Sequence, residues 1–166
     1  MVTVFICYGG SNGREIGLEL RHYLIESCNG MNPFLAGKGS PDIAAGQDFN
    51  SVIDEKLRET HVMVPICDLK LMFSKYARRE IITAIGQGTL IIPFMMDGRK
   101  LPERLKDVWA PIRYNPQNVK ASFPDLYMAI QNALLVRVND YFVRDLGTNP
   151  KTGIPPAIVR HVGRQR

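Results

Sequence analysis

Glu80 is the carboxylate whose neighbours in the sequence could support chemistry. It follows Tyr76 by four residues in an amphipathic stretch, so the ring and the carboxylate share one face of a predicted helix. Such a carboxylate can bind the hydroxyls of a ribose while the ring stacks on a flat heterocycle. A second interpretation is that Glu80, next to Arg78 and Arg79, simply solvates a helix face. The spacing by itself favours this second interpretation.

A glycine-rich segment, residues 8–13, follows the first apolar run. It lacks the spacing of the GxGxxG fingerprint, and the chain contains no GxxxxGK[ST] motif, which disfavours a P-loop nucleotide hydrolase. Backbone amides at the start of a helix can hold a phosphate or another anion. A tight strand-to-helix turn that needs glycine explains the same residues equally well.

The cysteines and histidines do not suggest a metal centre. Cys7, Cys28 and Cys67 form no CxxC pair and leave one thiol unpaired in any disulfide scheme, which fits a reducing compartment. The three histidines lack metal-ligand spacing with one another or with the cysteines. We therefore expect no metal site.

Short apolar runs alternate with amphipathic stretches along most of the chain. The predicted strands are Val2–Cys7, Asn32–Ala36, His61–Cys67, Thr89–Met95 and a weaker one at Trp109–Tyr114. The predicted helices are Arg14–Cys28, one that starts at Asp48, Ser74–Ile85 and Phe123–Val143, with a long loop at residues 37–47. This alternation predicts an α/β fold with a five-stranded parallel sheet and helices on both faces. Because ligands bind at the carboxyl ends of such strands, the site is expected after Cys7, Leu35 and Cys67.

Length and charge limit the function classes. The 166 residues suit one domain. Of the net charge of +5, residues 144–166 contribute five bases against one acid, so the rest of the chain is nearly neutral and a nucleic-acid surface is not indicated. We predict a domain at residues 1–143 and a basic, flexible tail at 144–166. The apolar runs are much shorter than the ~20 residues that span a bilayer, and no signal-peptide pattern is present, so we expect a cytoplasmic protein.

Four segments, in order, resemble the Toll/interleukin-1 receptor (TIR) domain family. V-F-I-C-Y at residues 4–8 resembles the V-F-I-S-Y pattern of its first strand. Residues 33–49 are similar to its second strand and BB loop, with Asp42 and Gly46 matching an R-D-x-x-P-G pattern. Residues 74–81 resemble S-x-W-C-x-x-E-[IL], and residues 90–105 the fourth strand and the following loop. The resemblance covers about residues 1–142 and implies a flavodoxin-like fold of five parallel strands.

The family includes scaffolds that signal by self-association and enzymes that cleave NAD at the nicotinamide–ribose bond. The resemblance implies that Glu80 matches the glutamate these enzymes use. Cleavage expels neutral nicotinamide and leaves an electron-poor ribose, whose positive charge a carboxylate stabilises. NAD is then the substrate, no cofactor is expected, and the products are nicotinamide and ADP-ribose or a cyclic isomer.

The resemblance also implies a set of pocket residues around Glu80. Those expected to bind substrate are Tyr8, Gly9, Gly10, Ser11, Phe34, Lys38, Gly46, Ser74 and Tyr76. The chain departs from the family pattern at three places. Tyr76 and Ala77 replace a Trp-Cys pair, and Gly9-Gly10 stands where a large residue often follows the tyrosine, which is expected to open the phosphate side of the pocket. Ala36 and Ala45 replace an acidic residue and the BB-loop proline.

These observations lead to the expectation of a stand-alone, prokaryotic-type NAD-cleaving TIR enzyme in anti-phage signalling. Its product would activate a separate effector, and contacts through the BB loop would assemble a homo-oligomer. One alternative is a TIR scaffold or adaptor, including a bacterial mimic that engages host TIR proteins. A more remote one is a flavodoxin-like enzyme that transfers glycosyl groups of nucleosides or nucleotides. The presence of Glu80 four residues after Tyr76 distinguishes the enzyme from the scaffold, because a scaffold does not need these two residues together.

Overall fold

The computed structural model describes residues 1–144, and of residues 141–144 only the backbone. It divides into two units, of which the first is Met1–Ile130; the fold and the sites below belong to this unit. The tail predicted at 144–166 lies, apart from Arg144, outside the described residues and stays a prediction.

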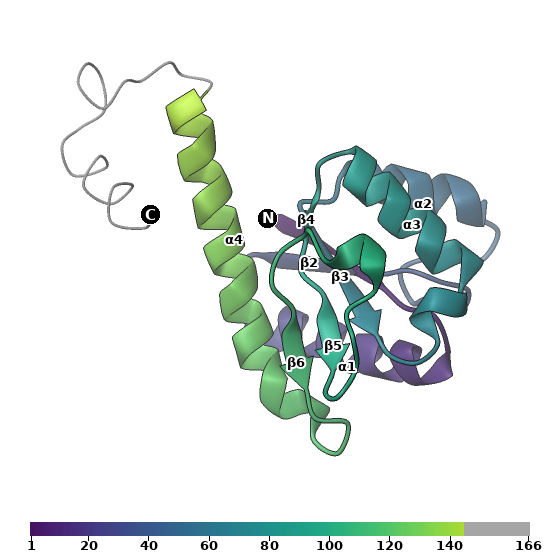
Figure 1. Cartoon of the computed structure of the whole chain (residues 1–166). Coiled ribbons are helices and arrows are strands. Elements are labelled where there is room, and N and C mark those ends of the chain that lie inside the picture. The colour runs from purple at the N-terminus through teal and green to yellow at the C-terminus, as the bar shows by residue number, and fades with distance from the viewer. Residues whose placement is uncertain (145–166) are drawn as a thin grey trace. The chain divides into compact units, whose positions relative to one another are not determined.

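The described residues form a parallel sheet with six strands. They are β1 Val2–Cys7, β2 Met31–Leu35, β3 Val62–Cys67, β4 Leu90–Ile91, β5 Phe94–Met96 and β6 Ile112–Tyr114. The strand order is β2-β1-β3-β5-β6, with β4 also paired to β3, and every pairing is parallel (Figure 1). This is the flavodoxin-like order, and it confirms the predicted α/β class with its parallel sheet.

The predicted fourth strand is divided into β4 and β5 by Pro93. Proline has no N–H to donate, so the ladder is interrupted at this residue. The flanking backbone still pairs: the amide of Ile92 donates to the carbonyl of Met63 at 3.0 Å, and the amide of Ile112 donates to the carbonyl of Pro93 at 2.9 Å. Two short strands therefore occupy the place predicted for one.

Four helices accompany the sheet in the described part of the chain. They are α1 Ser11–Ser27, α2 Phe49–Arg58, α3 Lys75–Gly86 and α4 Phe123–Arg144, with short 3₁₀ turns η1 Leu71–Phe73, η2 Glu103–Leu105 and η3 Val119–Ser122. Helix α1 begins three residues before its predicted start. Asp48 caps α2 by accepting from the amide of Ser51, and Ser74 caps α3 by accepting from the amide of Ala77. These caps fix where both helices begin.

The two faces of the sheet pack against different helices. Side chains alternate between the faces of a strand, so Phe5 and Cys7 of β1 point to one face, where they join Ile53 of α2 and Ala77 of α3 in one core. On the other face, the rings of Phe94, Tyr114 and Phe123 stack, with centroids 4.6 and 5.9 Å apart. Cys7 thus points from the last position of β1 toward α3, which is the helix that carries Glu80.

No helix among residues 1–144 combines the length and the apolar character that a membrane span requires. The expected cytoplasmic location stays a prediction.

Candidate active site

A pocket of about 340 Å³ lies where β1 and β2 end and where α1, α2 and α3 begin. The lining residues are Tyr8, Gly9, Gly10, Ser11, Arg14, Ala36, Gly37, Lys38, Phe49, Ser74, Tyr76 and Glu80. The volume is in the range of small-molecule sites. Two of the three expected strand ends, those after Cys7 and Leu35, contribute residues directly, and the segment beyond Cys67 contributes through Ser74.

The structure brings together eight of the ten residues that the sequence singled out. They are Tyr8, Gly9, Gly10, Ser11, Lys38, Ser74, Tyr76 and Glu80. Phe34 and Gly46 are not among the lining residues. Phe34 is 4% exposed, because its position in β2 points the ring into the core. There it packs against the ring of Phe5, with centroids 5.3 Å apart. Gly46 lies in the 37–47 loop at a φ of +87°, and a β-carbon added there would meet no atom within 4 Å.

Four lining residues were missed from the sequence. Ala36 and Gly37 directly follow β2, so the rule that ligands bind at strand ends could have found them. The sequence pattern predicts that Phe49 lies on the inward, apolar face of its helix, but as the first residue of α2 it reaches the pocket. The sequence pattern predicts a helix that starts at Arg14, whereas the observed start at Ser11 places Arg14 at the end of the first turn, among the lining residues.

Glu80 is the one acid among the lining residues, and it is only 5% exposed. Burial raises the pKa of its carboxyl to about 7, because the charged form is poorly solvated there. A hydrogen bond from the Cys7 thiol and the positive charge of Arg79 act in the opposite direction and lower this pKa. At neutral pH, protonated and ionised forms of Glu80 therefore coexist.

Cys7 is fully buried behind Glu80. Its Sγ lies 3.8 Å from the carbonyl oxygen of Ala77, one helical turn before Glu80. Burial, followed by the nearby Glu80, raises the pKa of the Cys7 thiol well above its ordinary value. Cys7 therefore stays protonated and serves as a hydrogen-bond donor, not as a nucleophile.

Aromatic side chains stand near Glu80. Tyr76 is 56% exposed, and its ring meets the ring of Phe49 edge-on with centroids 6.2 Å apart. Flat rings of this kind can stack on a heterocycle that enters the pocket. Ser74 holds the first turn of α3 in place through its cap, so it fixes the position of Tyr76 and Glu80 on that helix.

Tyr8 packs closely on the loop that follows β2. A β-carbon added at Gly37 would lie 2.1 Å from the Tyr8 hydroxyl oxygen, and Gly37 has a φ of +111°, so both space and backbone require glycine there. Arg14 donates from Nη2 to the carbonyl oxygen of Gly39 at 2.9 Å, and its guanidinium lies near the Tyr8 hydroxyl. Burial raises the pKa of the Tyr8 hydroxyl, and Arg14 acts against that rise. The phenol is therefore neutral at physiological pH.

Gly9 is glycine because the turn is crowded. A β-carbon there would lie 2.3 Å from the α-carbon of Leu71, and one at Gly10 would lie 2.9 Å from the β-carbon of Lys70. The expectation that these glycines open the phosphate side of the pocket is therefore corrected, since the 70–71 segment fills the space beside them. The tight-turn interpretation of Gly9 holds. Gly10 is the N-cap residue of α1. No side chain accepts a hydrogen bond from the first amides of that helix as a cap, so these amides can bind other groups.

Asp42 anchors the 37–47 loop. One of its oxygens, Oδ2, accepts from the amide of Leu35 at 2.8 Å and from Nε of Arg21 at 2.9 Å. The carboxylate thus ties the loop to the end of β2 and to α1. Asp42, which matches the BB-loop pattern of the family, therefore has a structural role, since it holds the loop against β2 and α1.

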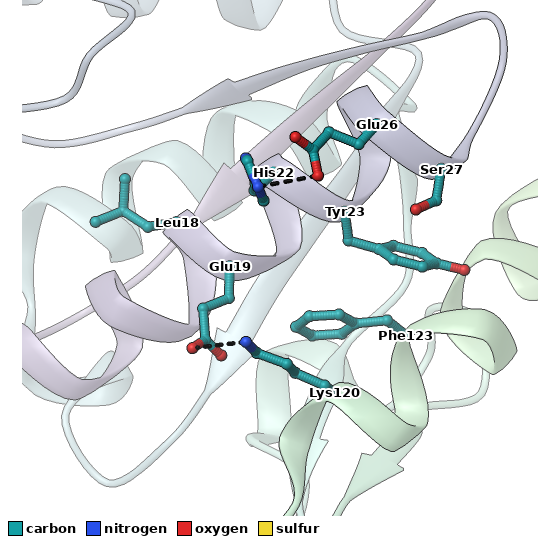
Figure 2. Close-up of a pocket in the computed structure, with 8 residues that line it drawn as sticks. All are labelled: Leu18, Glu19, His22, Tyr23, Glu26, Ser27, Lys120 and Phe123. Atoms are coloured by element: carbon teal, nitrogen blue, oxygen red, sulfur yellow. Dashed lines mark ion pairs between the residues drawn. The ribbon is translucent and has the colours of Figure 1, made fainter.

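A second pocket, of about 490 Å³, lies between the second half of α1 and residues 120–123 (Figure 2). Its carboxylates are paired: Glu26 with His22 at 3.0 Å and Glu19 with Lys120 at 3.4 Å. The ring of Tyr23 lies on Phe123, with centroids 5.5 Å apart. The carboxylates of this second pocket are well exposed, and Glu80 is not among its lining residues. The 340 Å³ pocket that contains Glu80 is therefore the better candidate for an active site. Within the described residues, no three His, Cys, Asp or Glu side chains gather closely enough to hold a metal ion.

Comparisons with known proteins agree with this fold. The model of the TIR domain family matches residues 4–126. The TIR domain of the Toll-related receptor TRR-2 from Hydra magnipapillata superposes with a TM-score of 0.51 at 16% identity, over 77% of this chain and 97% of that one. The TIR domains of the activated Roq1 resistosome, which directly recognises the pathogen effector XopQ, give a TM-score of 0.50 at 15% identity, over 99% of each chain. No curated protein sequence matches the chain.

Proposed function

The chain belongs to the TIR domain family, and we propose that it is an enzyme of that family which cleaves NAD at the nicotinamide–ribose bond. The observation that carries the proposal is Glu80, a buried carboxylate in a pocket that also presents aromatic rings. A scaffold does not need a buried acid at such a place, and burying a carboxylate is costly.

Glu80 can supply the electrostatic stabilisation that this reaction needs. As nicotinamide leaves, positive charge develops on the ribose, and a fixed anion beside it stabilises the transition state more than the ground state. Because Glu80 is 5% exposed, water screens this interaction poorly. The cationic pyridinium of bound NAD would further favour the ionised form of Glu80.

The other lining residues have roles that follow from their chemistry. Tyr76 and Phe49 offer rings on which nicotinamide can stack, and Ser74, whose hydroxyl accepts from the amide of Ala77, also lines the pocket. Most glycosidases use two carboxylates, but the leaving group here is a pyridinium and needs no general acid. Attack by water then gives ADP-ribose, and attack by a nucleophile within the substrate gives a cyclic isomer.

The decisive experiment compares nicotinamide release from NAD by the wild-type chain, Glu80→Gln and the control Glu55→Gln. Glu55 is an exposed acid on α2 outside the pocket, so its loss should leave activity unchanged. We expect Glu80→Gln to lower the rate roughly 100- to 1000-fold, by analogy with removal of one stabilising group from an active site. Unchanged release in Glu80→Gln would remove the catalytic assignment.

A second candidate is a signalling scaffold that acts by TIR–TIR association. It is favoured by Phe73, which is 82% exposed and directly precedes the lining residue Ser74 in the chain. The Roq1 TIR domains belong to an activated resistosome. For the enzyme, we propose self-association through the 37–47 loop and a separate effector that responds to the product. Absence of nicotinamide release by folded, concentrated protein, together with dimers that Phe73→Ser disrupts, would favour the scaffold over the enzyme.

A further inference from the structure

Charge is divided within the pocket. Glu80 is contributed by α3, while the two basic residues, Arg14 and Lys38, come from α1 and from the loop after β2. NAD is divided in the same way, with a cationic nicotinamide riboside at one end and an anionic diphosphate in the middle. We infer that Arg14 binds the diphosphate of the substrate and so determines which end of the molecule reaches Glu80. This inference rests on the proposed function.

Arg14 is held in place before any ligand arrives. Its side chain is half-buried, Nη2 donates to the carbonyl oxygen of Gly39 at 2.9 Å, and the guanidinium is near enough to the Tyr8 hydroxyl to lower the pKa of that group. A guanidinium carries five N–H donors, so these two contacts leave donors for a ligand. Because the side chain is already ordered, little conformational entropy is lost when it binds an anion.

The crowding at Gly9 explains why a base in this region comes from α1. No side chain fits at residue 9, because its β-carbon would lie 2.3 Å from the α-carbon of Leu71. Arg14 instead enters from the end of the first turn of a helix of 17 residues. The first amides of that helix have no side-chain cap, and they add a partial positive charge on the same side of the pocket.

This arrangement predicts a substrate preference. A guanidinium pairs with phosphate oxygens through two parallel hydrogen bonds, which a lysine ammonium does not reproduce. Arg14 should therefore strengthen the binding of substrates that have a diphosphate. It should not strengthen the binding of nicotinamide riboside, which has no phosphate. Nicotinamide mononucleotide, with one phosphate, should lie between them.

The test measures kcat and KM for NAD and for nicotinamide riboside in wild type, Arg14→Gln, Arg14→Lys and the control Arg58→Gln. Arg58 is an exposed base at the end of α2 and does not line the pocket. We expect Arg14→Gln to lower kcat/KM for NAD roughly 10- to 100-fold, through KM. The same variant should leave nicotinamide riboside unchanged, and Arg14→Lys should recover part of the loss. An equal loss for both substrates would overturn the inference, since it would show that Arg14 only supports the loop at Gly39.

Calorimetric titration with ADP separates this inference from the proposed function. ADP carries the diphosphate but no scissile bond, so its binding does not depend on catalysis. Binding by the wild type and the control that is lost in Arg14→Gln would support the diphosphate site even if NAD were not cleaved. No ADP binding by the folded wild type would overturn it even if NAD were cleaved.

Discussion

The thiol of Cys7 lies beside the carboxyl of Glu80 and lowers the pKa of that carboxyl, although one residue ends the first strand and the other lies on the third helix. The contact exists because β1 and α3 pack on the same face of the sheet, where Cys7 also lies 3.8 Å from the carbonyl oxygen of Ala77. This contact links β1, whose end leads into the lining residues of the pocket, to the carboxyl group proposed to stabilise the transition state. Three predictions about the acidity of Glu80 follow.

The activity should depend on ionisation of Glu80. Burial raises the pKa of Glu80 to about 7, and the carboxylate is the form that stabilises the developing positive charge. The value of kcat/KM for NAD should therefore fall as the pH drops below about 7 and level off above it. A profile that stays flat between about pH 5.5 and 8.5 would contradict this role of the carboxylate.

Changing the donor at residue 7 should move that pH profile. A hydroxyl is a stronger donor than a thiol, so Cys7→Ser should lower the pKa of Glu80 and shift the acidic limb to lower pH. Cys7→Ala removes the donor and should shift the limb to higher pH. Cys28→Ser is the matched control, because Cys28 is a buried cysteine outside the pocket. Movement of the limb in the same direction in both Cys7 variants would show that the hydrogen bond does not set this pKa.

Glu80 should destabilise the fold at neutral and alkaline pH. Its pKa rises from an ordinary 4.5 to about 7 on folding, so between these values the native state binds a proton that the unfolded state has released. Stability therefore falls as the pH rises through this window, by about 3 kcal/mol in total. Glu80→Gln keeps the shape of the neutral acid and should escape this loss. In thermal unfolding, the Tm of Glu80→Gln should rise relative to the Tm of the wild type between pH 5 and pH 8. A difference in Tm that does not change with pH would refute the raised pKa of Glu80.

Gly9→Ala should be strongly destabilising, because the new β-carbon would meet the backbone of Leu71 at 2.3 Å. Overpacking against backbone typically costs about 1–3 kcal/mol or more. Gly86→Ala is the control: Gly86 is the last residue of α3, with no atom close to where a β-carbon would stand. That change should be neutral or stabilising by up to about 1 kcal/mol. Equal free energies of unfolding for the two variants, measured in urea, would contradict the crowding.

Asp42→Asn should loosen the 37–47 loop. The change weakens the bonds to Arg21 and to the amide of Leu35 and leaves a half-buried guanidinium without its charge partner. We expect a loss of about 2 kcal/mol in the free energy of unfolding and faster proteolysis within the loop. Glu59→Gln, which breaks the more exposed pair with Lys56, should change stability by less than about 0.5 kcal/mol. Equal effects of the two substitutions would show that Asp42 does not anchor the loop.

The sequence by itself determined the sheet, its parallel order and the edge where the pocket lies. These follow from local patterns, such as the apolar run of β1 and the caps at Asp48 and Ser74, which operate within a few residues. It also identified eight of the lining residues, through a resemblance whose motifs sit at strand and helix ends.

Only the tertiary structure decided how those residues are used. Burial turned Glu80 from a charge on a helix face into an acid with a pKa of about 7, because desolvation depends on what covers a residue and not on its neighbours in the chain. The contact of Gly9 with Leu71 and the reach of Arg14 to Gly39 likewise join segments far apart in sequence. Phe34 was directed to the core by the alternation of β2, which no motif match could reveal. Long-range packing therefore selected, from the residues the sequence offered, those that face the pocket.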